Sequence, residues 1–227
     1  MKQSDHGILL NRISYSETSY ILTFYTKKDG IQKFIYQGGK KKSTNVFPLN
    51  CCELTYYKRN DSELGKLTQA DSNFPLLNIQ TNPVKSSIAF FLVDVLKQTL
   101  QTNQAEPLLY AFLEDQILAL NETEKTAHFP LHFLAKYTEH IGISPELTMN
   151  PRYFSMTEGD FHSEIRLGEL SIDGELCEQL LMLFEGENPT KEYRKELLTT
   201  LLHYYKIHSP KFDVSNSLEI ITALLYD

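Results

Sequence analysis

The sequence has little cysteine and no long hydrophobic run. Its 227 residues contain three cysteines, Cys51, Cys52 and Cys177, and an odd number with two of them adjacent excludes a disulfide framework. No segment reaches the ~18 apolar residues that a membrane helix requires. The apolar run at residues 8–10 is too short for a secretory signal. We therefore expect a cytoplasmic protein whose cysteines are small, buried apolar residues.

Motifs for catalysis and metal binding are also missing. The stretch GGKKKS lacks the glycine spacing of a phosphate-binding loop, and the chain has no G-x-S-x-G elbow. His128 and His132 have the spacing of a zinc pair, but Pro130 lies between them and no H-E-x-x-H arrangement is present. The residues therefore predict no catalytic group, no metal and no cofactor.

Basic residues are scarce in the chain as a whole but not in its first part. Residues 1–80 contain 11 Lys/Arg and 7 Asp/Glu, a net charge of +4, whereas residues 81–227 contain 11 and 22, a net charge of -11. These two values make up the total of -7. Regions of opposite sign indicate two modules with different partners, of which only the first would attract a polyanion.

The first ~75 residues read as five short strands. The candidates are GILLNRIS, TSYILTFYT, GIQKFIYQ, FPLNCCELTYYKR and GKLTQA. TSYILTFYT is rich in β-branched and aromatic types, and GIQKFIYQ alternates apolar and polar residues. Turn signals separate them at residues 28–30, 38–39 and 60–62. Five strands in this length favour an OB-fold barrel, with an SH3-like barrel as the alternative.

Helical patterns follow from about residue 82. Asn82 and Pro83 are typical of a helix start, Gly142 is a candidate helix stop, and Asn188 is a candidate cap of a later helix. The expected helices lie at residues 84–100, 107–121, 129–142, 174–186, 188–208 and 216–227. We therefore predict an α+β protein, with an OB-fold domain at residues 1–80 and an all-α helical domain at residues 81–227.

The basic residues of the barrel are the candidate binding site. Nine of them fall within 48 positions of a small β-domain: Arg12, Lys27, Lys28, Lys33, Lys40, Lys41, Lys42, Lys58 and Arg59. Such a set suits a nucleic-acid backbone, because neutralised phosphates release counterions. Five tyrosines are candidate stacking platforms for bases, of which we expect one or two to be exposed: Tyr20, Tyr25, Tyr36, Tyr56 and Tyr57.

The order of these features resembles a known family. YSETSYILTFYTKKDGI followed by YQGGKKKS is similar to the N-terminal region of the bacterial recombination mediator family RecO. LGKLTQAD resembles that family's closing strand, and LLTTLLHYYKIHSPKFDVSNSLEII resembles its last helices. The resemblance spans nearly the whole chain in the right order.

The resemblance implies an OB-fold followed by a helical domain. It also implies binding to single- and double-stranded DNA, annealing of complementary strands, and work with RecR to load RecA onto DNA coated by the single-stranded DNA-binding protein SSB. The resemblance implies a protein that neither forms nor breaks covalent bonds in a substrate, and that is therefore not an enzyme. The basic loop lysines would be DNA contacts, the helical domain would carry the partners RecR and the SSB tail, and the protein would be cytoplasmic at the nucleoid.

The chain departs from the family pattern in one region. Many members carry a four-cysteine zinc site, whereas residues 143–177 contain only Cys177. Because a closed structural zinc site needs four ligands, we predict no zinc in this degenerate zinc-finger region. Tyr153, Phe154 and Phe161 are candidates for an apolar cluster in its place. Ser16 and Glu17 stand where the family often has Gly-Glu.

Two other functions fit the same fold. A protein-interaction adaptor would use the barrel to bind an acidic partner instead of DNA. An RNA-binding module would use the same basic surface on a different nucleic acid. Binding to an unrelated oligonucleotide at two salt concentrations separates the adaptor from the other two, and competition between DNA and RNA separates those from each other.

Overall fold

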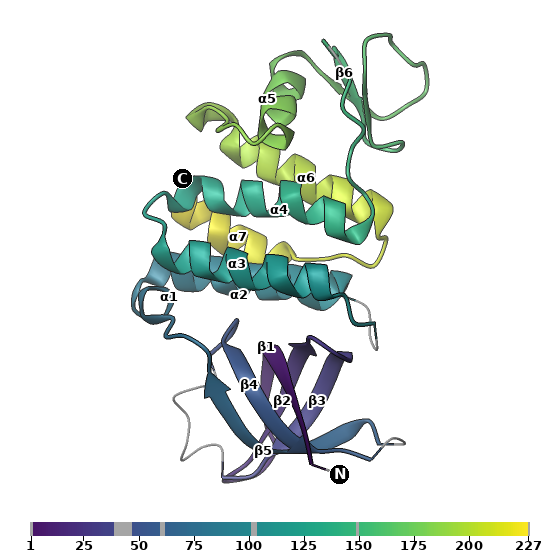
Figure 1. Ribbon diagram of the computed structural model, residues 1–227. Coiled ribbons are helices and arrows are strands. Elements are labelled where there is room, and N and C mark those ends of the chain that lie inside the picture. Colours follow the sequence, from purple (N-terminus) through teal and green to yellow (C-terminus); the bar gives the residue numbers. More distant parts are fainter. Residues whose placement is uncertain (1, 39–46, 60–61, 101–103, 149, 227) are drawn as a thin grey trace. The chain divides into compact units, whose positions relative to one another are not determined.

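The computed structural model describes residues 2–38, 47–59, 62–100, 104–148 and 150–226. The chain divides into two compact units, Met1–Thr123 and Glu124–Asp227. In the described parts, the first unit has a closed five-stranded barrel and three α-helices, and the second has four α-helices and a small sheet (Figure 1). The predicted class, α+β with an OB-like barrel followed by helices, is confirmed. The domain boundary at residue 80 stays a prediction about which part folds by itself.

The barrel closes in the strand order β1-β2-β3-β5-β4 (Figure 1). Only β3 and β5 run parallel, and every other neighbouring pair is antiparallel. The first strand starts earlier than predicted, because its polar first residues pair with β4, where Lys2 lies opposite Tyr57. The bounds are β1 (Lys2–Ser14), β2 (Tyr20–Thr26), β3 (Gly30–Tyr36), β4 (Cys51–Tyr57) and β5 (Leu64–Ser72).

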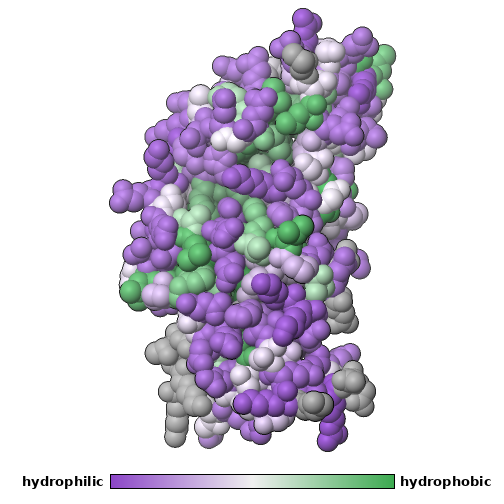
Figure 2. Space-filling model, in the orientation of Figure 1, coloured by the Kyte–Doolittle hydropathy of each residue, from purple (hydrophilic) through white to green (hydrophobic). Residues whose placement is uncertain are grey.

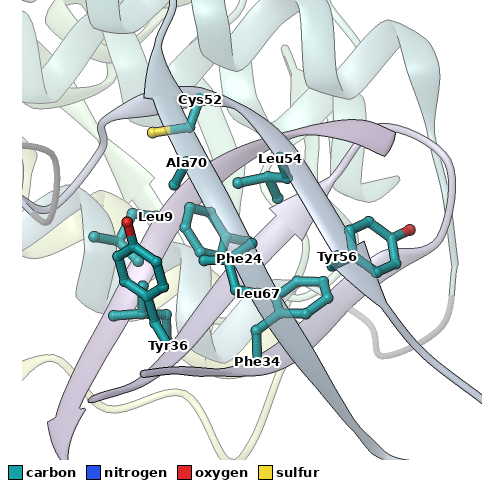
Figure 3. Packing of buried hydrophobic residues seen from close by; sticks show 10 residues of the cluster. Leu9, Phe24, Phe34, Tyr36, Cys52, Leu54, Tyr56, Leu67 and Ala70 are labelled. Atoms are coloured by element: carbon teal, nitrogen blue, oxygen red, sulfur yellow. The ribbon is translucent and has the colours of Figure 1, made fainter. Parts of the chain in front are cut away.

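The interior of the barrel is filled by apolar and aromatic side chains (Figure 3). The ring centroids of Phe34 and Tyr56 are 4.7 Å apart, and those of Phe34 and Phe24 are 6.1 Å apart. Gly65 lets Phe34 lie against the β5 backbone, since a Cβ there would come within 2.7 Å of the Phe34 ring. Alternate residues of each strand therefore point inward, which leaves the others for the outer surface.

Part of the outer barrel surface is covered within the same unit. The ring of Tyr110 on α3 (Pro107–Glu122) stacks on Tyr25 of β2 with centroids 6.2 Å apart. Tyr25 pairs with Ile8, which pairs with Cys51, and all three are buried. The remaining helices of this unit are α1 (Leu77–Thr81), which was not predicted, and α2 (Pro83–Thr99), whose start is capped by Asn82 as expected.

The three cysteines are buried, as predicted, and are free thiols. Burial raises the pKa of the Cys52 thiol to about 12, and it raises the pKa of Cys51 still further. Burial also raises the pKa of Cys177, to about 11. Thiols held in the protonated form are poor nucleophiles and poor metal ligands, so these cysteines have a packing role.

The second unit is mainly helical. Gly142 ends α4 in the left-handed region with φ 74°, as expected for a helix stop. The prediction for Asn188 is wrong: a 3₁₀ turn comes before α6, and Asn188 Oδ1 instead lies 3.0 Å from His132 Nε2. The elements are η2 (Thr126–His128), α4 (Phe129–Ile141), α5 (Gly174–Phe184), η3 (Lys191–Tyr193), α6 (Arg194–His208) and α7 (Ser215–Leu225).

Residues 153–173, in the predicted degenerate zinc-finger region, contain a three-stranded sheet. Its strands are β6 (Tyr153–Ser155), β7 (Asp160–His162) and β8 (Ser171–Asp173), in the order β7-β6-β8. The expected apolar cluster is present in part: Phe154 and Phe161 are buried, with ring centroids 4.7 Å apart. Tyr153 instead stacks on His162 at 5.6 Å.

Candidate nucleic-acid interface

A row of side chains on β1, β4 and β5 forms the centre of the candidate interface. In the strand register Lys2 lies opposite Tyr57, and Tyr57 lies opposite Lys66. All three side chains are exposed, Tyr57 to 49%. Because neighbouring strands are about 4.8 Å apart, the aromatic ring stands between two ammonium-bearing side chains on adjacent strands.

The same surface continues onto β3. Lys66 lies opposite Ile35, and Lys33, two residues before Ile35, lies opposite the exposed Leu64. Residues two apart on a strand share a face, so Lys33 belongs to the surface that Lys66 occupies. We call this surface the basic barrel face and define it by Lys2, Lys33, Tyr57, Leu64 and Lys66.

The cations of the basic barrel face are not held by ion pairs to other described residues. Within the residues that the structure describes, neither Lys2, Lys33 nor Lys66 forms an ion pair; the pairs found there involve Lys97 and Arg166. Figure 2 shows a predominantly hydrophilic surface over the barrel. The face can therefore accept an anionic ligand without first losing an internal ion pair.

The predicted residues Lys27, Lys28 and Lys58 gather elsewhere, around the β2–β3 turn. Lys28 Nζ donates a hydrogen bond to the backbone carbonyl of Ser4 at 2.8 Å, and Lys58 Nζ donates one to Gln32 Oε1. The Lys27 ammonium lies 5.9 Å from the centre of the Tyr110 ring, on the face of that ring. We call these three residues the turn lysines; each of them is engaged by neighbouring groups of the protein.

A buried carboxylate lies beside the turn lysines. Asp5 accepts hydrogen bonds from the backbone N–H groups of His6 and Lys28, at 2.8 and 3.1 Å. Burial raises the pKa of Asp5, while these hydrogen bonds and the Lys28 charge oppose that rise. The turn is thus held by a carboxylate network, which lowers the positive potential that its lysines present to a ligand.

The remaining predicted residues are distributed as follows. Arg12 lies on β1 opposite Leu22 and stacks its guanidinium over Tyr20, 5.3 Å from the ring centre, at the far end of β2 from the turn lysines. Arg59 is exposed two residues beyond Tyr57. Lys40, Lys41 and Lys42 lie outside the described residues. Of the predicted residues that the structure describes, Lys33 is the one that lies on the basic barrel face.

Most of the five candidate tyrosines are buried and one is exposed, as expected. Tyr25, Tyr36 and Tyr56 are buried, Tyr20 is partly buried, and Tyr57 is exposed. Burial raises the pKa of Tyr56 to about 12, which is consistent with a core hydroxyl. Among these five candidates, Tyr57 has a ring placed for contact with a base.

Two residues of the basic barrel face, Lys2 and Lys66, were missing from the sequence-based set. Each lies in a polar stretch of the chain, and what joins them is the pairing of β4 with both β1 and β5. Sequence shows their charge but not this register. The total of 11 Lys/Arg in residues 1–80 includes both, but the predicted set of nine did not.

The histidine pair does not form a metal centre with neighbouring ligands. The rings of His128 and His132 are 6.3 Å apart, and burial lowers the pKa of His128, with the charge of Arg194 adding to the effect. Across the described parts of the chain, no group of three or more His, Cys, Asp or Glu side chains is arranged to hold a metal ion. The same parts contain no helix with the length and hydrophobicity needed to cross a membrane.

Fold and site together define a class: α+β proteins with an OB-like barrel whose outer face carries lysines and an aromatic ring. Comparison with known proteins narrows this class. The Recombination protein O N terminal family matches residues 1–74, and the Recombination protein O C terminal family matches residues 80–216.

Relatives agree over the whole length of the chain. The DNA repair protein RecO of Phocaeicola vulgatus is 28% identical over 240 residues, which cover 99% of each chain. That of Christiangramia forsetii is 24% identical over 232 residues, covering 96% of this chain and 97% of the relative. That of Flavobacterium psychrophilum is 26% identical over 236 residues, covering 97% and 98%. The chain belongs to the RecO family of DNA repair proteins.

Proposed function

We propose that this protein is a recombination mediator that binds single- and double-stranded DNA through the basic barrel face. The row formed by Lys2, Tyr57 and Lys66 carries the proposal, because it combines an exposed ring with two cations that form no ion pair to the residues the structure describes. Lysines that neutralise phosphates release counterions, which gives affinity without sequence preference. Tyr57 adds a stacking contact that only an unpaired base can use.

The activity that follows is annealing of complementary strands. Cations on one face screen the repulsion between two phosphate backbones, and stacking on Tyr57 holds a base away from its own strand. Neither step forms or breaks a covalent bond. We therefore propose a mediator that is not an enzyme and that needs no metal or cofactor.

The proposed protein partners are RecR and SSB, with which the protein would load RecA onto SSB-coated DNA. Family membership supports this assignment. Charge supports it as well, since residues 124–227 contain 9 Lys/Arg and 17 Asp/Glu. A region with net negative charge repels DNA and is better suited to protein partners. Such work would take place in the cytoplasm, at the nucleoid.

Annealing of complementary oligonucleotides, with and without bound SSB, tests the proposal. The protein should accelerate annealing in both cases, and the triple variant with Lys2, Lys33 and Lys66 changed to Glu should lose the acceleration. A folded triple variant that anneals at the wild-type rate would remove the basic barrel face from the mechanism.

Binding measurements test the competing functions. Affinity for an unrelated oligonucleotide should fall steeply as salt rises, with a slope of about 0.9 per neutralised phosphate in logarithmic units for duplex DNA. Failure to bind any oligonucleotide at low salt would favour an adaptor for an acidic protein. Preferential binding of RNA in direct competition would favour the RNA-binding alternative.

A further inference from the structure

The connection between β7 and β8 in the second unit exposes three aliphatic side chains. It spans residues 163–170, which we call the β7–β8 loop. Ile165 is 68% exposed, Leu167 94% and Leu170 50%. An exposed aliphatic side chain is common when it stands alone, but several of them close together are typical of an interaction site. The β7–β8 loop is therefore a candidate contact for a partner.

The β7–β8 loop is held in shape by bonds to the small sheet. Arg166 donates two hydrogen bonds to the Asp160 carboxylate of β7, at 2.9 and 2.7 Å, and lies 3.7 Å from Glu169. Met156 N donates to the Leu170 carbonyl at 2.9 Å, where the loop returns to β8. A bidentate pair fixes the direction of a guanidinium. The aliphatic side chains are thus presented on an ordered frame, which lowers the entropy lost when a partner binds.

The region that contains the β7–β8 loop is negatively charged. Residues 143–177 contain two Lys/Arg and seven Asp/Glu, a net charge of -5, and one of the two cations, Arg166, is bonded to Asp160. Glu164, next to Ile165 in the sequence, is exposed. Net negative charge repels nucleic acids and anionic membranes. A basic protein surface with apolar side chains is the partner that matches this loop.

The basic barrel face has the complementary character. Its three lysines, Lys2, Lys33 and Lys66, form no ion pair within the described residues. They share the face with two exposed side chains that offer apolar area, Tyr57 at 49% and Leu64 at 39%. In protein interfaces, apolar side chains meet at the centre while charges of opposite sign attract each other at the rim. Two surfaces of one chain therefore match in charge and in apolar content.

We propose that the β7–β8 loop of one copy of this protein docks on the basic barrel face of a second copy. An eight-residue loop is small beside the ~1,200 Å² that a stable protein interface buries. The pair is therefore reciprocal, and each copy contributes one loop and one face. DNA and the second copy use the same lysines, so each displaces the other. This competition rests on the proposed function, whereas the self-association does not.

Sedimentation velocity of the full chain, over about a hundredfold range of concentration at low salt, tests the association. The average mass should rise from one copy to two and stop there. It should return to one copy at high salt, where the attraction between charges is screened. A saturating single-stranded oligonucleotide of about 10 residues should also restore single copies. Protein that remains a single copy at every concentration overturns the inference and leaves DNA binding standing.

Two charge reversals assign the contact to these surfaces. Glu164→Lys and Lys66→Glu should each weaken the association at least tenfold, because each places like charges in both contacts of the pair. An equal mixture of the two variants should associate again, since the reversed loop of one meets the reversed face of the other. The control Glu219→Lys makes the same charge change at an exposed position of α7 and should associate like wild type. A mixture that remains as single copies overturns the inference.

Removal of exposed aliphatic side chains tests the apolar part of the contact. Ile165→Ser together with Leu167→Ser should weaken the association about tenfold and leave the fold intact, because both side chains are exposed. Leu108→Ser, which changes an exposed aliphatic side chain of α3, is the matched control. The double variant should bind DNA at least as tightly as wild type. Association of the double variant at the wild-type level overturns docking through the loop.

The outcomes separate this inference from the proposed function. Association that responds to the charge reversals, in a protein that binds no oligonucleotide, leaves the self-contact standing and overturns the proposed function. An oligonucleotide that binds the pair without dissociating it overturns docking on the basic barrel face and leaves DNA binding standing.

Discussion

Two groups of lysines in the same barrel have different roles. Lys28 and Lys58 of the turn lysines donate hydrogen bonds to protein oxygens, and a buried carboxylate lies beside them. Lys2, Lys33 and Lys66 of the basic barrel face form no ion pair within the described structure and surround an exposed tyrosine. The difference shows that the number of cations in a domain does not identify its binding surface. What counts is whether each ammonium group already has a partner inside the protein.

The largest expected loss of DNA affinity comes from reversing the charges of the basic barrel face. Changing Lys2, Lys33 and Lys66 to Glu removes three phosphate contacts and adds three repulsive charges. Duplex affinity should fall by roughly 100-fold at moderate salt, and the salt slope should fall by about 2.7. Titrations at several salt concentrations measure both. The control variant changes Lys136, Lys191 and Lys211 of the second unit to Glu, which alters the net charge by the same amount. An equal loss of DNA affinity in this control would mean that only net charge matters.

The next largest loss of DNA affinity is expected from the three lysines that follow Gly38 and Gly39. Replacing Lys40, Lys41 and Lys42 with Glu should weaken DNA binding by at least ~10-fold at moderate salt, since each lost phosphate contact removes part of the electrostatic contribution. These residues lie outside the described structure, so the prediction rests on sequence. Unchanged affinity in a folded variant would confine the interface to the strands.

Removing the Tyr57 ring separates stacking from charge. Tyr57→Leu should weaken binding of single strands about tenfold, because stacking of one base contributes about 1–3 kcal/mol, and should change duplex affinity less than about twofold. Tyr15→Leu is the matched control, since Tyr15 is also exposed but lies outside the face. An equal loss for both DNA forms would show that Tyr57 does not contact unpaired bases.

A pair of single substitutions sharpens the comparison between the two lysine groups. Lys58→Met removes the hydrogen bond to the buried Gln32 and should lower the free energy of unfolding by about 1 kcal/mol, with little effect on DNA affinity. Lys66→Met should do the reverse, weakening DNA binding about threefold without loss of stability. Urea unfolding and DNA titration of both variants check this, and the same response from both would remove the distinction.

The smallest effect concerns Asp5. Because burial raises its pKa above 3.8 in the folded state, the folded protein binds more protons than the unfolded chain in the window from about pH 3.8 up to the raised value. The free energy of unfolding should therefore fall as pH rises through that window. Asp5→Asn, which cannot ionise, should lack this fall. Parallel pH profiles of the two proteins would show that Asp5 titrates normally.

Sequence patterns predicted the elements that have a period or a cap. Alternation in residues 30–37, together with strand-type composition and turn signals elsewhere, located all five barrel strands, although the first begins five residues earlier than predicted. Asn82 and Gly142 correctly marked helix ends. The strands β6, β7 and β8 have three residues each, too few to show a period, and helix α1 has five. These elements exist because tertiary packing stabilises them.

The candidate site was predictable only in part, because sequence shows which residues are charged but not how the strands pair. Charge counting located the basic domain and Lys33. The surface itself depends on strand register, which brings residues 2, 57 and 66 together across more than sixty positions of sequence. Local patterns carry no such information, and they also cannot show that Lys28 and Lys58 are used inside the protein.

Chemical labelling of lysine amines, with and without a DNA oligonucleotide, tests the central claim most directly. Acetylation read by mass spectrometry reports each lysine of the unmodified sequence separately. We expect DNA to protect Lys2, Lys33 and Lys66 strongly and to leave the labelling of Lys28 and Lys58 nearly unchanged. Protection of the turn lysines, with unchanged labelling of the basic barrel face, would contradict the account.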